Sequence, residues 1–320
     1  MAKPPEPDES GDPLLAASPA LFAALSPLGR RLRMPANFLP QQTAEARGKR
    51  FNATIGQITD GHGRAVPLPS LAPALAGLPE AARSRALLYS PVEGLGELRE
   101  RWRARQRRGQ PEDRPSSLPL TTGGAVHALS LAAQLFAAPG RPVLVPDPVP
   151  DGYPEIFGLR AGARLLPVAL EPGRLAAALG ALPAGEPVLL AVSASPGLPP
   201  AEQAALVRTL VEAAGERPIV VLVDDRAERL DPADGEAASP SLFWDLIDRH
   251  PALVALKADG AEGELGYPGG RIGFLTLPFP PDSPAARELE AKLKLLLRAE
   301  IGSPSAASQM VLLAGLEGGE

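Results

Sequence analysis

Short apolar runs alternate with helical segments through most of the chain. The runs that predict strands are residues 118–122, 142–146, 163–168, 188–192, 218–223, 252–257 and 271–277. Several of them have almost no polar alternation, which is typical of strands that are buried on both faces. The pattern therefore predicts a sheet that is covered on both sides.

Helical spacing appears between these runs. The segments that predict helices are residues 125–138, 200–216 and 241–249. The second of them is well marked, because it begins with Pro200, carries Leu206 and Leu210 one turn apart, and is followed by Pro218. Strands that alternate with helices in this way predict an α/β fold with a mostly parallel central sheet.

Composition and charge narrow the function classes. The 320 residues carry a formal net charge of -5 and include no cysteine. The absence of cysteine excludes a disulfide scaffold, a zinc-thiolate site and a cysteine nucleophile. The mild negative charge gives no reason to expect nucleic acid or a membrane as a partner. A polar N-terminus and the lack of a long apolar run predict neither a signal peptide nor a membrane span, so a cytoplasmic location is expected.

The 32 basic residues are very unevenly divided, because 27 are arginines. The five lysines are Lys3, Lys49, Lys257, Lys292 and Lys294. Few side chains are therefore candidates for amine chemistry. The one strongly basic run, residues 99–108, is interpreted as the solvated face of a helix, since Trp102 alone among its residues is aromatic.

Candidate binding residues follow the predicted strands, where ligands bind in α/β sheets. Thr121 and Thr122 are followed by Gly123, Gly124 and Ala125, which open a helix. Glycines and a helix N-terminus together favour a phosphate, although the same turn is also found where only tight packing is needed.

Acidic and basic residues follow two later strands. Asp224 and Asp225 end one of them, where a carboxylate can pair a protonated ring nitrogen, bind Mg²⁺ or cap a turn. Arg271 opens the last predicted strand and is suited to a phosphate. His62 is interpreted as a loop residue and His127 as a packing residue. No metal site is expected, because no second histidine or acidic residue lies at ligand spacing.

The order of these motifs resembles class I/II aminotransferases, the fold-type-I enzymes that depend on pyridoxal phosphate (PLP). The motifs that carry the resemblance are SPLGRRLRMP from Ser26, NATIGQITD from Asn52, YSPVEGLGELRE from Tyr89, TTGGAVHALSLAA from Thr121, VPDP from Val145, VDD from Val223, LKADGA from Leu256 and GGRIGFLTL from Gly269. The resemblance implies a three-layer α/β/α fold and covers nearly the whole chain.

The resemblance also implies roles for individual residues. Gly123, Gly124, Ala125 and Arg271 would hold the cofactor phosphate, and Asp224 would keep the pyridine nitrogen protonated. Tyr89 would reach the phosphate across a dimer interface. Gly56 lies in the segment that approaches the substrate, and Ser195 replaces the asparagine that bonds the pyridine hydroxyl.

The departures from the family pattern bear on activity. Gly263 stands where the family has its Schiff-base lysine, eight residues before Arg271, and glycine can neither form that bond nor move a proton. Lys257 is not expected to substitute, because it lies within a strand pattern. Ala227 replaces a tyrosine that normally follows the ring aspartate, and the ring-stacking aromatic position falls on Val149 or Pro150, both of which remain candidates.

The resemblance implies a domain division as well. We expect a disordered tail over residues 1–12, an N-terminal arm over 13–60, and a large cofactor domain over 61–310. Residues 311–320 would begin a small C-terminal domain that is truncated or lost. Three hypotheses follow: a degenerate aminotransferase impaired in catalysis that binds PLP at most non-covalently, an active PLP transaminase that uses Lys257 or a partner chain, and a non-catalytic dimer partner of a complete paralogue. The expected assembly is a homodimer, or a heterodimer with a complete paralogue.

Overall fold

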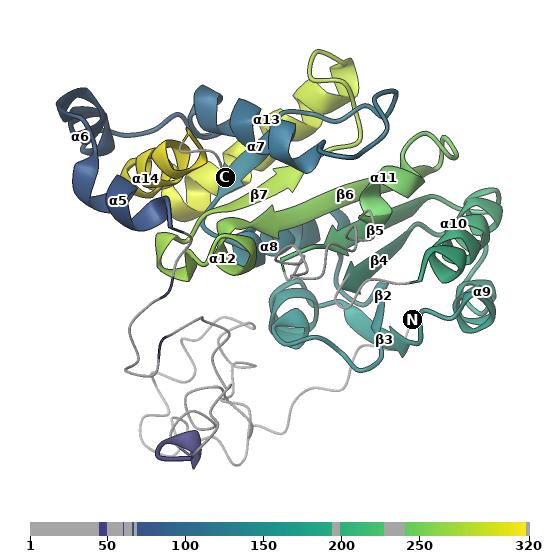
Figure 1. Cartoon of the computed structure of the whole chain (residues 1–320). Coiled ribbons are helices and arrows are strands. Elements are labelled where there is room, and N and C mark those ends of the chain that lie inside the picture. Colours follow the sequence, from purple (N-terminus) through teal and green to yellow (C-terminus); the bar gives the residue numbers. More distant parts are fainter. Residues whose placement is uncertain are drawn as a thin grey trace, which may run out of the picture.

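The computed structural model of the chain describes residues 45–49, 60, 66, 69–193, 199–226 and 241–317. A seven-stranded sheet runs through this part of the chain in the order β1-β7-β6-β5-β4-β2-β3 (Figure 1). The strands are β1 (Leu120–Thr122), β2 (Pro142–Pro146), β3 (Arg164–Val168), β4 (Val188–Ser193), β5 (Ile219–Asp224), β6 (Leu253–Gly260) and β7 (Gly273–Thr276). The sheet is parallel from β3 to β6, and β7 runs antiparallel to both of its neighbours. The predicted mostly parallel sheet is confirmed.

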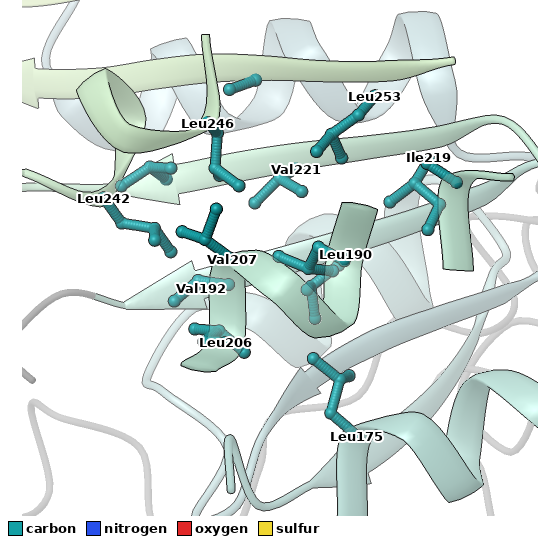
Figure 2. Close-up of a cluster of buried hydrophobic side chains, with 14 of the residues drawn as sticks. Leu175, Leu190, Val192, Leu206, Val207, Ile219, Val221, Leu242, Leu246 and Leu253 are labelled. Carbon is teal, nitrogen blue, oxygen red and sulfur yellow. The ribbon is translucent and has the colours of Figure 1, made fainter. Parts of the chain in front are cut away.

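Helices cover both faces of the sheet, so the fold has the expected three layers. One face packs against α8 (Ala125–Phe136), the π-helical segment η1 (Pro154–Arg160) and α13 (Pro284–Ile301). The opposite face packs against α9 (Pro172–Gly180), α10 (Pro200–Ala214) and α11 (Leu242–Leu246). Figure 2 shows the second interface, where Leu206 and Val207 of α10 lie over Val192 and Val221 of the sheet.

The alternation of strand residues decides which side chains meet which layer. Val221 and Val223 of β5 pack with α10 and α11, whereas Leu222 between them packs with the α8 side. Because successive side chains of a strand point to opposite faces, the same rule extends to the polar residues at the strand ends. The alternation along β5 therefore places Asp224 and Asp225 on different sides of the sheet.

A third group of helices lies beyond β7. It contains α5 (Leu71–Gly77), α6 (Glu80–Ala86), α7 (Gly96–Gln106) and α14 (Ala306–Glu317), with α12 (Ala261–Glu264) and the 3-10 turn η2 (Pro268–Gly270) beside them. Figure 1 shows α5, α6 and α14 at one end of the molecule and α9 and α10 at the other. No helix within the described ranges is both long enough and apolar enough to cross a membrane.

Several predicted elements differ from the structure at their ends, three of them as follows. The predicted helix 241–249 stops at Leu246, because Ile247 is extended and Asp248 has a positive φ of 57°. The predicted strand 252–257 continues to Gly260, and the predicted strand 271–277 begins only at Gly273. The late start of that strand follows from the left-handed backbone of Arg271, whose φ of 49° interrupts extended structure.

The basic run of residues 99–108 is helical, but the prediction that it is simply a solvated face is wrong at two positions. Arg99 and Trp102 of α7 are buried. The Arg99 guanidinium donates to the carbonyl of Pro119 and pairs with Glu290 at 3.0 Å. The Trp102 ring stacks on Phe274 of β7 with 4.3 Å between centroids. One side of this helix therefore belongs to the core.

The predicted division into domains stays a prediction. Its first segment, 1–12, and most of its second, 13–60, lie outside the described residues. The expected boundary between residues 310 and 311 falls inside α14, whose buried side chains pack against α5 and α7.

Candidate functional site

Asp224 lies at the end of β5, on the side of the sheet that α8 covers. Its carboxylate accepts a hydrogen bond from the Tyr153 hydroxyl at 3.1 Å. The Arg226 guanidinium pairs with the same oxygen at 3.1 Å, and the backbone N–H of Arg226 donates to the other oxygen at 3.2 Å. Burial raises the pKa of Asp224, while Arg226 and these hydrogen bonds favour the ionised form. Both carboxylate oxygens are therefore engaged by the chain itself.

The glycine turn before α8 is held in place by close backbone packing. Gly124 has a φ of 106°, which favours glycine, and it precedes the first residue of the helix. Gly273 of β7 lies directly beneath it, and a β-carbon at that position would overlap the backbone of Gly124 and Ala125. The N-terminus of α8 therefore rests on a strand that has no side chain at the point of contact.

The predicted phosphate-binding residues come together at this turn, and a carboxylate lies among them. Glu262 of α12 pairs with Arg271 at 2.6 Å and accepts a hydrogen bond from the backbone N–H of Ala125. A β-carbon at Gly124 would lie 2.6 Å from both the Glu262 carboxylate and the Arg271 guanidinium. Burial raises the pKa of Glu262, whereas Arg271 and the Ala125 N–H oppose that rise.

His127 occupies the other N–H of the turn. Its Nδ1 accepts a hydrogen bond from the backbone N–H of Gly123 at 3.0 Å, which places the ring proton of the neutral form on Nε2. That nitrogen lies 2.6 Å from Glu300, and Glu300 also pairs with Arg160. The prediction of a packing role for His127 is therefore incomplete, because its ring bonds to the turn itself.

The family model for aminotransferase class I and II matches residues 50–319 of the chain. The chain belongs to this family. No curated protein matches the sequence.

Solved structures of aminotransferases show the same fold. The aminotransferase from Anaerococcus prevotii superposes with a TM-score of 0.73 at 18% identity, over 86% of this chain and 70% of that one. The aspartate aminotransferase from Thermus thermophilus with maleate gives 0.69 at 21% identity, over 92% and 73%. The Escherichia coli protein YbdL, identified as having a methionine aminotransferase function, gives 0.64 at 20%, over 90% and 71%.

The pocket residues do not fit PLP in the way the aminotransferase family implies. The arginine, aspartate and glycine turn are present, but the Asp224 and Arg271 side chains, the Gly123 N–H and the Ala125 N–H are bonded within the chain. Gly263 lies in α12, where a β-carbon would approach the carbonyl oxygen of Arg226 to 2.9 Å. A side chain at this position would therefore have to displace backbone.

Lys257 lies on the other side of the sheet from Asp224. It shares a face of β6 with Ala255, which packs in the layer of α10 and α11. Its ammonium group pairs with Asp225 and lies 3.5 Å from Asp259. The sheet separates this amine from the glycine turn and from Asp224.

A buried cluster surrounds Lys257. The Ser241 hydroxyl donates to Asp225 at 2.5 Å, and the Asp259 carboxylate accepts from Trp102 Nε1 at 3.1 Å and from Gln106 Nε2 at 2.9 Å. Burial raises the pKa of Asp259 to about 6, although Lys257 and the two hydrogen bonds oppose it. The cluster connects α7, the start of α11 and β6 on the face of the sheet that α10 and α11 cover.

The Asp259 carboxyl makes stability depend on pH. Its ordinary pKa is 3.8, so between about pH 4 and pH 6 the folded state holds a proton that the unfolded chain has released. Stability should therefore fall as pH rises through this range, by about 3 kcal/mol for the full pKa difference. Asp259→Asn should lack this contribution. Urea unfolding at several pH values between 4 and 7 measures it, and equal pH slopes for the two proteins would contradict the assignment.

The remaining predicted site residues lie only in part within the described ranges. Tyr89 is 95% exposed, so it makes almost no contact within the chain. Gly56, Ser195, Ala227 and His62 lie outside the described residues. Val149 packs at the edge of the core on the α8 side. The roles predicted for these residues stay predictions.

Three residues that the sequence did not single out complete the pocket: Tyr153, Arg226 and Glu262. Arg226 directly follows the aspartate pair and Glu262 directly precedes Gly263, so both charges were visible beside the motifs. Their partners were not visible, because each pairs with a residue of another element.

Proposed function

We propose that this chain is a member of the aminotransferase family that does not carry out normal transamination. The observation that carries the proposal is the combination of Gly263 with the place of Lys257. The family's amine position has no side chain, and the lysine nearest to it in sequence among the described residues is paired on the opposite face of the sheet. Amino-group transfer in this family needs an amine that can reach the cofactor, and neither residue supplies one.

Purified protein, mixed with PLP and then treated with borohydride, tests this proposal. Borohydride makes a lysine adduct permanent, and peptide mass spectrometry then identifies the modified lysine. We expect no specific adduct in the pocket, whereas a complete aminotransferase treated in parallel should be labelled at its catalytic lysine. An adduct on Lys257, together with amino transfer that Lys257→Ala abolishes, would instead support the active-transaminase hypothesis.

Any binding of PLP to this chain is proposed to be non-covalent. It would involve Asp224, Arg271 and the turn of Gly123, Gly124 and Ala125, with Ser195 near the ring hydroxyl. These groups would first have to give up their present partners within the chain. The cytoplasm is the proposed location.

A second candidate function is that of a non-catalytic dimer partner. An exposed apolar segment supports it, since Leu87, Leu88 and Tyr89 follow one another and are 88%, 67% and 95% exposed. Such a segment is typical of an interaction surface, and the family resemblance places Tyr89 at the dimer interface. Sedimentation of the protein alone and with a complete paralogue tests this function, and finding only monomer in both cases would remove it.

A further inference from the structure

Three groups of the anion cup at the start of α8, the Gly123 N–H, the Ala125 N–H and the Arg271 guanidinium, have a partner from the same chain. The cup consists of the Gly123 and Ala125 N–H groups, the Gly124 backbone and the Arg271 guanidinium. His127 accepts from Gly123, and the Glu262 carboxylate bonds Ala125 and pairs with Arg271. Donors at a helix N-terminus together with an arginine are suited to an anion, and here the anion is a side chain.

The Glu262 side chain is more buried than is usual for one member of a surface ion pair. Its side chain is only 15% exposed, while that of Arg271 is 56% exposed. The carboxylate is therefore the buried member of the pair, and it lies against Gly124, where a β-carbon would approach it to 2.6 Å. A phosphoryl group would be repelled by this carboxylate, because both are anionic, and it would compete with it for the Arg271 guanidinium and the Ala125 N–H.

At Asp224 the two charges exchange roles, because there the site residue is the carboxylate and its partner from the same chain is an arginine. Arg226 pairs with the buried Asp224 carboxylate at 3.1 Å, and its guanidinium lies over the Tyr153 ring at 5.9 Å. Arg226 also acts electrostatically on Glu262. Asp224 with Arg226 and Glu262 with Arg271 thus form two ion pairs within the chain.

We propose that Glu262 determines the ligand specificity of this pocket, by occupying the anion cup and excluding phosphate-bearing ligands. The inference deepens the proposed function and rests on it, because it explains how a family member without the catalytic lysine keeps the remaining pocket charges paired. Arg226 pairs with the Asp224 carboxylate in a similar way. A phosphate-bearing ligand enters the cup only when the Glu262 carboxylate leaves it.

Calorimetric titration of the full chain with inorganic phosphate tests this assignment. Glu262→Ala frees Arg271 and the Ala125 N–H, so it should bind phosphate at least about tenfold more tightly than the unmodified protein, the effect of one charge-assisted contact. Glu262→Gln retains the side-chain size and removes the charge, so it should also bind more tightly. This second variant keeps the test decisive if the alanine variant does not fold.

Two further variants test whether the gained phosphate affinity comes from the anion cup. Glu288→Ala removes an exposed carboxylate on α13 and should leave phosphate binding unchanged. Adding Arg271→Ala to Glu262→Ala should abolish the gained affinity. Equal affinity of the unmodified protein and both Glu262 variants would overturn the proposal, as would a gain that survives the loss of Arg271. The outcome is independent of lysine adducts, so borohydride labelling that contradicts the proposed function would leave this comparison readable.

Discussion

Replacing Lys257 with methionine should lower the free energy of unfolding by about 3–5 kcal/mol, the largest effect expected of any single substitution in this chain. The ammonium group is buried and pairs with Asp225, whose side chain is also buried, and it lies 3.5 Å from Asp259. Without it, two buried carboxyl groups face each other with no cation between them. Methionine keeps the length and apolar stem of the side chain, so the loss is mainly electrostatic.

Urea unfolding measures this effect, and a second substitution tests its cause. Adding Asp225→Asn to Lys257→Met should recover a large part of the loss, because the amide still accepts from Ser241 without carrying a charge. Lys294→Met is the matched control, since Lys294 pairs with Glu93 in a partly exposed position and should cost at most about 1 kcal/mol. Equal losses at Lys257 and Lys294 would show that the buried cluster does not stabilise the sheet.

Replacing Gly273 with alanine should lower stability by about 3 kcal/mol and should also move the start of α8. The β-carbon would overlap the backbone of Gly124 and Ala125, which has no flexible end that can turn aside. Opposite Gly273 on β6 lies Gly260, whose own β-carbon would approach the Ile272 carbonyl to 2.9 Å. The helix can relieve the overlap only by rising from the sheet.

Urea unfolding gives the loss of stability, and the backbone amide signals of Gly124 and Ala125 in NMR report the movement. Gly269→Ala is the control, because Gly269 lies four residues earlier with open space around its α-carbon. We expect that variant to stay within about 0.5 kcal/mol of the unmodified protein. A Gly273 variant as stable as the Gly269 variant, with unchanged amide signals, would disprove the packing of α8 on β7.

The fold was largely predictable because its signals are local. Apolar runs such as 188–192 and helix signals such as Pro200 lie in adjacent residues, and the strands and helices they predict are present. Two elements have weaker local signals: η1, which begins at Pro154, was not predicted, and α7 was predicted as a helix but carries a basic run that conceals its buried Arg99 and Trp102. In these elements, contacts with distant parts of the chain decide which residues are buried.

The candidate site was predictable only in its parts. The glycine turn follows one predicted strand, Asp224 ends another and Arg271 opens the last, so their convergence at one edge of the sheet could be inferred from the order of elements. The pairing of Arg271 with Glu262 could not, because α12 and the left-handed backbone of Arg271 bring the two charges together. Strand alternation placed Lys257, but its partner Asp225 depends on the register between β5 and β6.

The sequence by itself determined the family, the α/β sheet and the small number of lysines, which are five. These properties are carried by residue identity and spacing, which need no coordinates. The tertiary structure alone decided that Lys257 is held in a buried cluster across the sheet from Asp224, and that Glu262 pairs with Arg271 and Arg226 with Asp224. The physical reason is that the energy of a charge depends on the groups within a few ångströms of it, and these groups come from elements far apart in the chain.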